Sequence, residues 1–266
     1  MLRGFYTAAS GMIAQQRHQE ALSNNITNAN TPGYKADQAT LRAFPELLIQ
    51  QMGSKNIPTK DGHQIAQRQG IGSLNTGVYV QEFVPNFAQG DLRETNMSTD
   101  LALVNGQFPD EKGSVFFTVQ NEQGDVRYTR NGNFTVDSEG YLVTNEGYYV
   151  LNEAGNPIQT NGVQFTVTPE GLVQADGQMT QLGIRYAANP LELSKEGNDL
   201  FSGETEQVPQ GATFHVQQGS LEQSNVDSLQ SMTQMMEAFR IFETNQRVLK
   251  AYDESLGKAV NDIARF

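Results

Sequence analysis

A helical stripe of apolar and small residues marks the N-terminal end of the chain. Between positions 2 and 29 these residues recur in steps of mostly three and four, which is the spacing of one helix face. Three glutamines, Gln15, Gln16 and Gln19, interrupt the stripe and reduce the apolar area that it can bury. Because ordering costs roughly 1–2 kcal/mol per residue for the backbone alone, this helix is expected to need partners. The members of the stripe are Leu2, Phe5, Ala9, Met12, Leu22, Ile26 and Ala29.

A second helical stripe closes the chain and predicts a helix over residues 226–263. It contains no Pro, and no Gly before Gly257. A helix of this length spans about 55 Å at 1.5 Å per residue, which is typical of a coiled coil or a helix bundle. An ordinary intramolecular hairpin of the two terminal helices would bury the same residues and stays open as an alternative. The members of the stripe are Leu229, Met232, Met236, Phe239, Phe242, Asn245, Leu249, Tyr252, Leu256, Val260 and Ile263.

The first helix is expected to end in an asparagine-rich segment, because Asn side chains compete with the helix for backbone hydrogen bonds. Pro32 disfavours a helical conformation at Thr31, and Pro32-Gly33 fits the two central positions of a type II turn. This segment therefore predicts an elbow at which the chain leaves the helix sharply. The elbow residues are Asn28, Asn30, Thr31, Pro32, Gly33 and Tyr34.

The spacing of apolar residues changes twice along the middle of the chain. Residues 37–52 favour a short helix interrupted at Pro45, and residues 53–76, rich in Gly, Lys, Gln and Thr, favour an exposed loop or linker. From Gly77 to about Phe214 the period becomes two, with turn residues at intervals of 8–12, which is typical of an antiparallel sandwich or barrel-like body. The expected strands are 78–84, 101–104, 115–120, 126–129, 133–136, 141–143, 148–151, 163–167, 172–174, 179–186 and 213–217.

These patterns predict an α+β protein whose N- and C-terminal long helices form a coiled-coil-like axial part around a central antiparallel all-β body. The expected division is an axial helical domain of residues 1–36 with 219–266, a short helix and linker over 37–76, and a β domain over 77–218.

Composition narrows the function. The formal net charge of −12 removes the usual electrostatic attraction to nucleic acids and anionic membranes. No cysteine is present, so disulfides, Cys-metal sites and thiol catalysis are excluded. No cleavable signal peptide and no apolar run long enough to span a membrane is visible. We therefore expect neither nucleic-acid binding nor membrane insertion.

Candidate chemistry in the sequence is weak. No nucleophile elbow, His-Glu-x-x-His pair or Walker loop is present. Gly70-Ile71-Gly72 lacks the third glycine of a dinucleotide-binding motif, and Asp137-Ser138-Glu139-Gly140 lacks the ligand ladder of a calcium loop. The three histidines share no spacing motif. We therefore predict that the protein is not an enzyme and has no catalytic, cofactor-binding or metal-binding residues.

Several segments resemble, in order, those of bacterial flagellar rod and hook proteins. The segment from Ser23 to Lys35, which reads Ser-Asn-Asn-Ile-Thr-Asn-Ala-Asn-Thr-Pro-Gly-Tyr-Lys, resembles the N-terminal signature of that family. Residues 219–227 resemble the segment before its C-terminal helix. Further matching segments lie at 90–92, 99–103, 128–134 and 137–143. The similarity covers nearly the whole chain. The length of the chain resembles that of the distal-rod type, and of the rod homologues of Gram-positive bacteria.

The resemblance implies a structural subunit of the axial rod that transmits torque from the motor to the hook. It implies copies of itself and other rod or hook axial proteins as partners. It also implies export by the flagellar type III apparatus without a cleaved signal peptide, and a location in the flagellar basal body. One departure from the family pattern is a longer, charged loop over residues 105–114.

A second hypothesis from a different class is a secreted, β-rich module that binds or hydrolyses the cell wall and uses flagellar export. Paired carboxylates such as Glu204 and Glu206 suggest this chemistry. Spacing in the sequence gives no separation in space, however, so solvated loop charge is the favoured interpretation.

Overall fold

The structure is a computed structural model that describes residues 2–56, 64–110, 112–197 and 199–263. A helix begins and ends the described chain: α1 spans Leu2–Thr27 and α2 spans Ser228–Ile263. Both predicted helices are confirmed. The chain divides into two compact units, which we call the helix-and-arm unit (Met1–Leu22, Ala39–Phe83 and Thr233–Phe266) and the body (Ser23–Gln38 and Val84–Met232).

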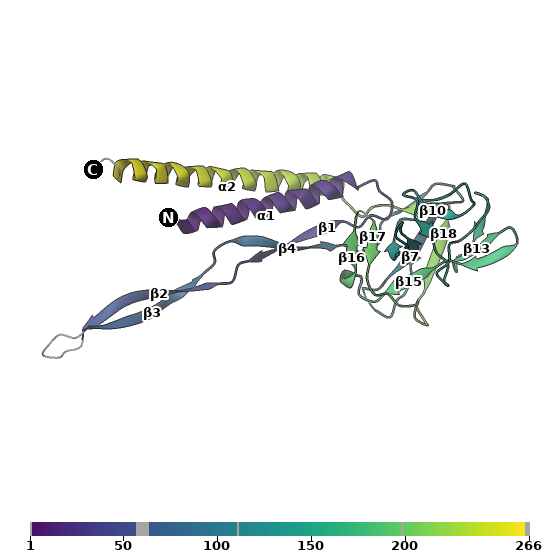
Figure 1. Cartoon of the computed structure of the whole chain (residues 1–266), viewed down its shortest axis with the longest axis horizontal. Coiled ribbons are helices and arrows are strands. Elements are labelled where there is room, and N and C mark those ends of the chain that lie inside the picture. The colour runs from purple at the N-terminus through teal and green to yellow at the C-terminus, as the bar shows by residue number, and fades with distance from the viewer. Residues whose placement is uncertain (1, 57–63, 111, 198, 264–266) are drawn as a thin grey trace. The chain divides into compact units, whose positions relative to one another are not determined.

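In the helix-and-arm unit, α1 and α2 lie side by side in opposite directions, with the two chain ends at the same end of the pair (Figure 1). Two glycines of α1 mark the close approach. A Cβ added to Gly4 would collide with the Tyr252 hydroxyl, and one added to Gly11 would lie 3.0 Å from Asn245 Nδ2. The missing side chains therefore leave room for polar side chains of α2.

The arm, which is residues 39–83 of the helix-and-arm unit, differs from the structure predicted for residues 37–52 and 53–76. Instead of a short helix and a linker, β1 (Asp37–Ala43) pairs with β4 (Val78–Pro85), and β2 (Leu47–Asn56) pairs in antiparallel register with β3 (Gln64–Leu74). The apolar spacing around Leu47 fits a helix locally. Residues 47–56 form a strand because they pair with residues 64–74, and no local pattern reveals this pairing. The part of the predicted linker at 57–63 lies outside the described residues.

The body is built on one eight-stranded sheet in which neighbouring strands pair antiparallel. Its strand order is β16 (Ser194–Glu196), β17 (Leu200–Ser202), β8 (Val126–Thr129), β7 (Ser114–Gln120), β11 (Tyr149–Val150), β10 (Leu142–Thr144) and β9 (Phe134–Val136), and β15 (Ile184–Ala187) also pairs with β7. Three smaller sheets complete the body: β12 (Thr166–Val167) with β13 (Leu172–Ala175) and β14 (Gln178–Gln181), β6 (Leu101–Asn105) with β18 (Phe214–Gln218), and β5 (Leu92–Glu94) with β19 (Ser220–Glu222). A 3₁₀ helix spans Pro190–Glu192.

The core of the body surrounds β7, which is buried on both faces from Ser114 to Val119. Phe117 packs in the larger cluster, edge to face with Phe134 at 5.1 Å between ring centroids. Phe116 points to the other face and joins the smaller cluster with Phe201. Alternation along one strand therefore supplies both clusters, as expected for a strand with apolar neighbours on each face.

Most predicted strands of the body are present with small changes in their ends. The predicted strand 179–186 is wrong as a single element, because β14 and β15 belong to different sheets. Leu182 N–H donates to Gly171 O and Gly183 N–H to Leu151 O, so the chain changes partners between the two strands. In the 105–114 loop, Gln107 exchanges hydrogen bonds with Thr213, and the Tyr186 hydroxyl donates to Asp110. Glu111 of this loop lies outside the described residues.

Candidate assembly site

The predicted stripe of α1 is not its most buried face. The fully buried side chains of α1 in the helix-and-arm unit are Ala8, Ala14, Ala21 and Leu22. The predicted members Phe5, Ala9, Met12 and Ile26 are half-buried, and the side chain of Leu2 lies outside the described residues. On another side of α1, Thr7 Oγ1 donates to Thr76 O of the arm at 3.1 Å. Small residues let α1 lie close to both α2 and the arm.

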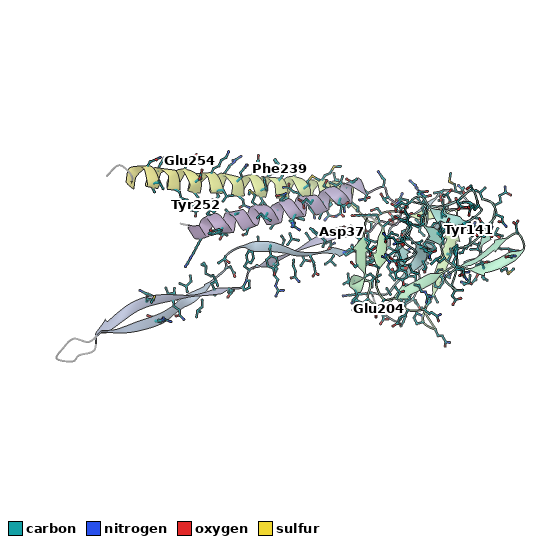
Figure 2. The ribbon with its side chains drawn as sticks, viewed as in Figure 1. Asp37, Tyr141, Glu204, Phe239, Tyr252 and Glu254 are labelled. Carbon is teal, nitrogen blue, oxygen red and sulfur yellow. The ribbon has the colours of Figure 1, made fainter. Side chains whose placement is uncertain are left out.

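The predicted stripe of α2 separates into two faces. The least exposed positions follow a strict alternation of four and three residues, which is the repeat of a coiled-coil seam. Five predicted residues belong to this face: Phe242, Asn245, Leu249, Tyr252 and Leu256. Figure 2 labels Tyr252 on the side of α2 that faces α1. The seam positions are Ser231, Met235, Ala238, Phe242, Asn245, Leu249, Tyr252, Leu256 and Ala259.

The other predicted residues of α2 lie on exposed faces. Met236 is 58% exposed and Phe239 is 52% exposed. Large apolar side chains in such positions mark a surface that another molecule covers. The side chain of Ile263 lies outside the described residues. The exposed members of the predicted stripe are Leu229, Met232, Met236, Phe239 and Val260.

The elbow follows the end of α1 and has the predicted turn. Tyr34 N–H donates to Thr31 O at 3.3 Å, and Gly33 has φ +70°, the conformation that a type II turn requires at its third position. The Asn28 amide donates to Asn24 Oδ1 at 2.9 Å, and Thr31 Oγ1 donates to Asn28 Oδ1. A Cβ at Gly33 would collide with the backbone of Arg130. Glycine is therefore needed here both for its φ and for its size.

Tyr34 anchors the elbow in the body. Its side chain is fully buried, and its hydroxyl donates to Asn25 Oδ1 at 3.2 Å. Burial raises the pKa of the Tyr34 hydroxyl, and the Asp37 carboxylate raises it further. Lys195 Nζ lies 4.1 Å from the Tyr34 ring centroid and 2.8 Å from Asp37 Oδ2. The aromatic ring thus stays neutral beneath a cation–carboxylate pair.

A buried ionic cluster, which consists of Lys35, Arg130 and Glu222, lies next to the elbow. Lys35 Nζ is 2.7 Å from Glu222 Oε1, and Arg130 Nε is 2.9 Å from Glu222 Oε2. All three side chains are fully shielded from solvent. The carboxylate therefore bridges two cations, one directly after the elbow and one directly after β8.

Further hydrogen bonds surround the cluster. Lys35 Nζ donates to Ala88 O at 2.8 Å, and Gly90 N–H donates to Glu222 Oε1 at 3.0 Å. Arg130 donates to Val115 O at 2.7 Å and to Leu103 O at 3.2 Å. Gly33 N–H donates to the backbone oxygen of Glu222 at 2.8 Å, which joins the elbow to β19 directly. Hydrogen bonds of this kind make a buried charge tolerable.

The cluster holds two positive charges and one negative charge, and the pKa values reflect this imbalance. Burial, together with the positive charge of Arg130, lowers the pKa of Lys35 to about 8, although Glu222 opposes the change. Burial raises the pKa of the Glu222 carboxyl, but Arg130 and Lys35 outweigh it and hold this pKa below its usual value. Glu222 therefore stays ionised under all ordinary conditions, and Lys35 is the group that can release the excess charge.

Sequence reasoning missed this cluster. A usable signal existed, because each of the three segments 23–35, 128–134 and 219–227 carries a charge beside apolar or turn residues: Lys35, Arg130 and Glu222. Only the fold shows that these segments meet.

Three family domains match the chain. Residues 5–35 match the flagella basal body rod protein domain, residues 112–175 match the flagellar hook protein FlgE/F/G D1 domain, and residues 217–262 match the C-terminal domain of the flagellar basal body rod FlgEFG proteins. FlhO of Bacillus subtilis, a flagellar hook-basal body complex protein, is 43% identical over 277 residues and covers 100% of both chains. The chain belongs to the flagellar hook and basal-body rod protein family.

Two further relatives carry the name flagellar basal-body rod protein FlgG. The protein of Borreliella burgdorferi is 31% identical over 98% of both chains. That of Agrobacterium fabrum is 32% identical over 95% of this chain and 96% of its own. Each of the three matched family domains contributes one member of the buried cluster: Lys35, Arg130 and Glu222.

The described part of the chain contains no helix apolar enough to qualify as a membrane span. Within those same residues, no three His, Cys, Asp or Glu side chains are grouped so that they could hold a metal ion.

Proposed function

We propose that this protein is a structural subunit of the flagellar basal-body rod, of the distal type, which polymerises into the shaft that transmits torque to the hook. The observation that carries the proposal is family membership over the full chain, with relatives named as rod proteins. These relatives are named as flagellar hook-basal body and basal-body rod proteins, which supports a structural role.

The finer part of the proposal concerns the terminal helices, which act as a coiled-coil-like axial element. The repeat of four and three along α2 supports this role, as do the small residues of α1 at its contacts with α2. The sequence-predicted residues on the exposed faces, such as Met236 and Phe239, serve in contacts with neighbouring copies. The division into an axial domain of residues 1–36 with 219–266 and a β domain of 77–218 belongs to the same proposal.

The elbow residues from Asn28 to Tyr34 have a structural role in this proposal. They lead the chain out of α1, and the hydrogen bond from Gly33 to Glu222 ties that exit to the segment before α2. The geometry of assembly thus depends on the place where both helices enter the body.

The proposed partners are further copies of this chain and other rod or hook axial proteins. The proposed route is export by the flagellar type III apparatus to the basal body, with the first residues retained. Family membership supports both statements.

Deletion of residues 2–22 tests the proposed function. It removes the α1 residues of the helix-and-arm unit and leaves the elbow and body residues in place. We expect loss of the chain from purified basal bodies and loss of motility, with a body that still melts cooperatively. Met179→Ser, at an exposed position of β14, is the control and should leave all three readouts unchanged. Normal motility of the deletion strain would refute the proposal.

The alternative of a secreted cell-wall module receives no support from the comparisons, whose matches are flagellar proteins. Release of peptidoglycan fragments by the purified, folded protein would support this alternative.

A further inference from the structure

A groove opens on the helix pair beside the α1–α2 seam, at the seam position Met235. It has a volume of about 380 Å³ and is lined by Gln19 of α1 and by Met235, Met236, Phe239 and Arg240 of α2. Most of its surface is apolar, and Met236 and Phe239 are more than half exposed. All of these residues belong to the helix-and-arm unit.

Gln19, which lines the groove, also has an unmet hydrogen bond. Gln19 Nε2 is shielded from solvent and has no hydrogen-bond partner, and the same holds for Oε1 of Gln15, one turn earlier in α1. A buried amide donor without an acceptor is costly, and native structures satisfy nearly all such groups. The isolated chain is therefore incomplete at this point, and whatever covers the groove is expected to bring an oxygen acceptor.

These features together define the chemistry of the occupant. Methionine and phenylalanine side chains favour an aromatic ring, and an arginine at the rim favours the face of such a ring. The Gln19 amide requires an oxygen at the edge of the ring. A phenol satisfies all of these requirements in one side chain.

Tyr6 matches this description. Its side chain is 64% exposed, whereas the other eight tyrosines, all of which the structure describes, are half-buried or buried. It cannot reach the groove of its own chain, because Gln19 follows it by thirteen residues on the same straight helix, or about 20 Å. Tyr6 can fill the groove only in another copy.

We propose that the groove receives Tyr6 from a second copy of this chain, with its ring against Met236 and Phe239 and its hydroxyl accepting a hydrogen bond from Gln19. The proposal rests on the proposed function, and it names the contact that the exposed helix face makes. Ile13, seven residues after Tyr6 and 56% exposed, then meets Met232, seven residues before Phe239 on the oppositely directed α2. The same seven-residue spacing on both helices lets one helix fill both places.

This contact joins two different surfaces and is therefore heterologous. Copies related by it are displaced along the helix by about 20 Å and form an open filament instead of a closed dimer. Its two surfaces remain available at opposite ends of a growing stack, as continued addition of subunits requires.

Disulfide trapping tests the contact directly, because the natural chain contains no cysteine. Tyr6→Cys and Met236→Cys are co-expressed as separate chains, and purified basal bodies are oxidised and run on a non-reducing gel. We expect a linked dimer for this pair. The pair of Tyr6→Cys with Ile241→Cys is the matched control, since Ile241 is exposed on α2 but does not line the groove, and it should stay monomeric.

The outcomes separate this inference from the proposed function. Both variants present in basal bodies without a linked dimer, or with equal linkage in the control pair, would overturn the groove contact and leave the rod function standing. Absence of even the unaltered chain from basal bodies would overturn the rod function itself.

The hydrogen bond has its own test in strains that carry each variant as the only copy of the chain, with incorporation into basal bodies as the measurement. We expect Tyr6→Phe to reduce incorporation about fivefold, as loss of one hydrogen bond predicts, and Tyr6→Ala to reduce it further. Tyr6→Phe in a Gln19→Leu chain should cost nothing more, because the donor is already gone. Equal, independent losses from the two changes would show that Tyr6 and Gln19 do not interact.

Discussion

The two units of this chain differ in where their apolar side chains go. Both hydrophobic clusters, which include Phe116, Phe117 and Phe134, lie entirely in the body. The helix-and-arm unit buries mainly alanines, and it exposes large residues such as Tyr6, Leu48 and Phe239. A body with its own core can fold alone, whereas a unit that exposes its apolar side chains depends on other molecules to cover them.

Charge follows the same division. The body contains seven Lys or Arg residues and twenty-one Asp or Glu residues, whereas the helix-and-arm unit contains eleven and nine. The net negative charge of the chain thus resides in the body. Like-charged bodies repel one another, so attraction between copies has to come from the nearly neutral helices and arm. Under the proposed function, folding and association therefore belong to separate parts of one chain.

Amide hydrogen exchange should show the largest contrast between the two units. In the dilute monomer, amides of β7 should exchange only with global unfolding of the body, and those of β2 and β3 should exchange orders of magnitude faster, because an isolated two-stranded hairpin is marginal in water. Assembly into rods should slow exchange in the arm and leave β7 unchanged. Equal protection of the two regions in the monomer would break the comparison.

Removal of the central carboxylate should remove much of the stability of the body. Glu222→Gln leaves Lys35 and Arg130 buried without their counter-charge, and we expect the free energy of unfolding to fall by about 3–5 kcal/mol. The measurement is chemical denaturation followed by near-ultraviolet circular dichroism.

Glu243→Gln is the matched control, since its partner Arg247 lies 3.9 Å away on an exposed face of α2. This exposed pair should contribute only about 0.2–0.5 kcal/mol. Similar losses in both variants would show that burial does not distinguish the two ion pairs.

The excess charge of the cluster predicts a rise in body stability at alkaline pH. Burial lowers the pKa of Lys35 to about 8 in the folded protein, below its ordinary value of 10.5. Between these values the unfolded chain binds the proton and the folded chain does not, so the free energy of unfolding increases with pH. Thermal melts across pH 7.5–9.5, below the range in which the tyrosines of the unfolded chain ionise, should show this rise in the natural protein, and Lys35→Met should lose it. A decrease over the same range in the natural protein would reverse the assignment.

The N-terminal cap of α2 should contribute the smallest of these effects. Asp227 Oδ1 accepts a hydrogen bond from Gln230 N–H at 2.9 Å, the geometry of a helix cap. Asp227→Ala should lower the free energy of unfolding by about 1 kcal/mol, and Asp227→Asn should restore most of it, because Asn caps equally well. The difference between the thermal melts of the two variants measures the contribution of the cap alone. If both variants melted like the natural protein, the cap would contribute nothing to stability.

The parts of the fold that depend on local chemistry could be read from the sequence. Apolar spacing located both terminal helices, Pro32-Gly33 predicted the turn of the elbow, and alternation found most strands of the body. The arm was missed because Leu47 and its neighbours have a spacing that fits a helix, while their conformation is decided by pairing with β3. Of the buried residues of α1 in the helix-and-arm unit, the predicted stripe includes only Leu22, because small residues such as Ala8 and Ala14 carry no strong apolar signal.

The sequence by itself therefore determined the two helices, the elbow between helix and body, and the family. Only the tertiary structure decided which helix faces are buried, that residues 39–83 form a paired arm, and that Lys35, Arg130 and Glu222 share one buried site. The physical reason is distance along the chain. A turn or a helix follows from a few neighbouring residues, but a charge buried at Lys35 is stable only because Glu222, almost two hundred residues later, returns to the same place.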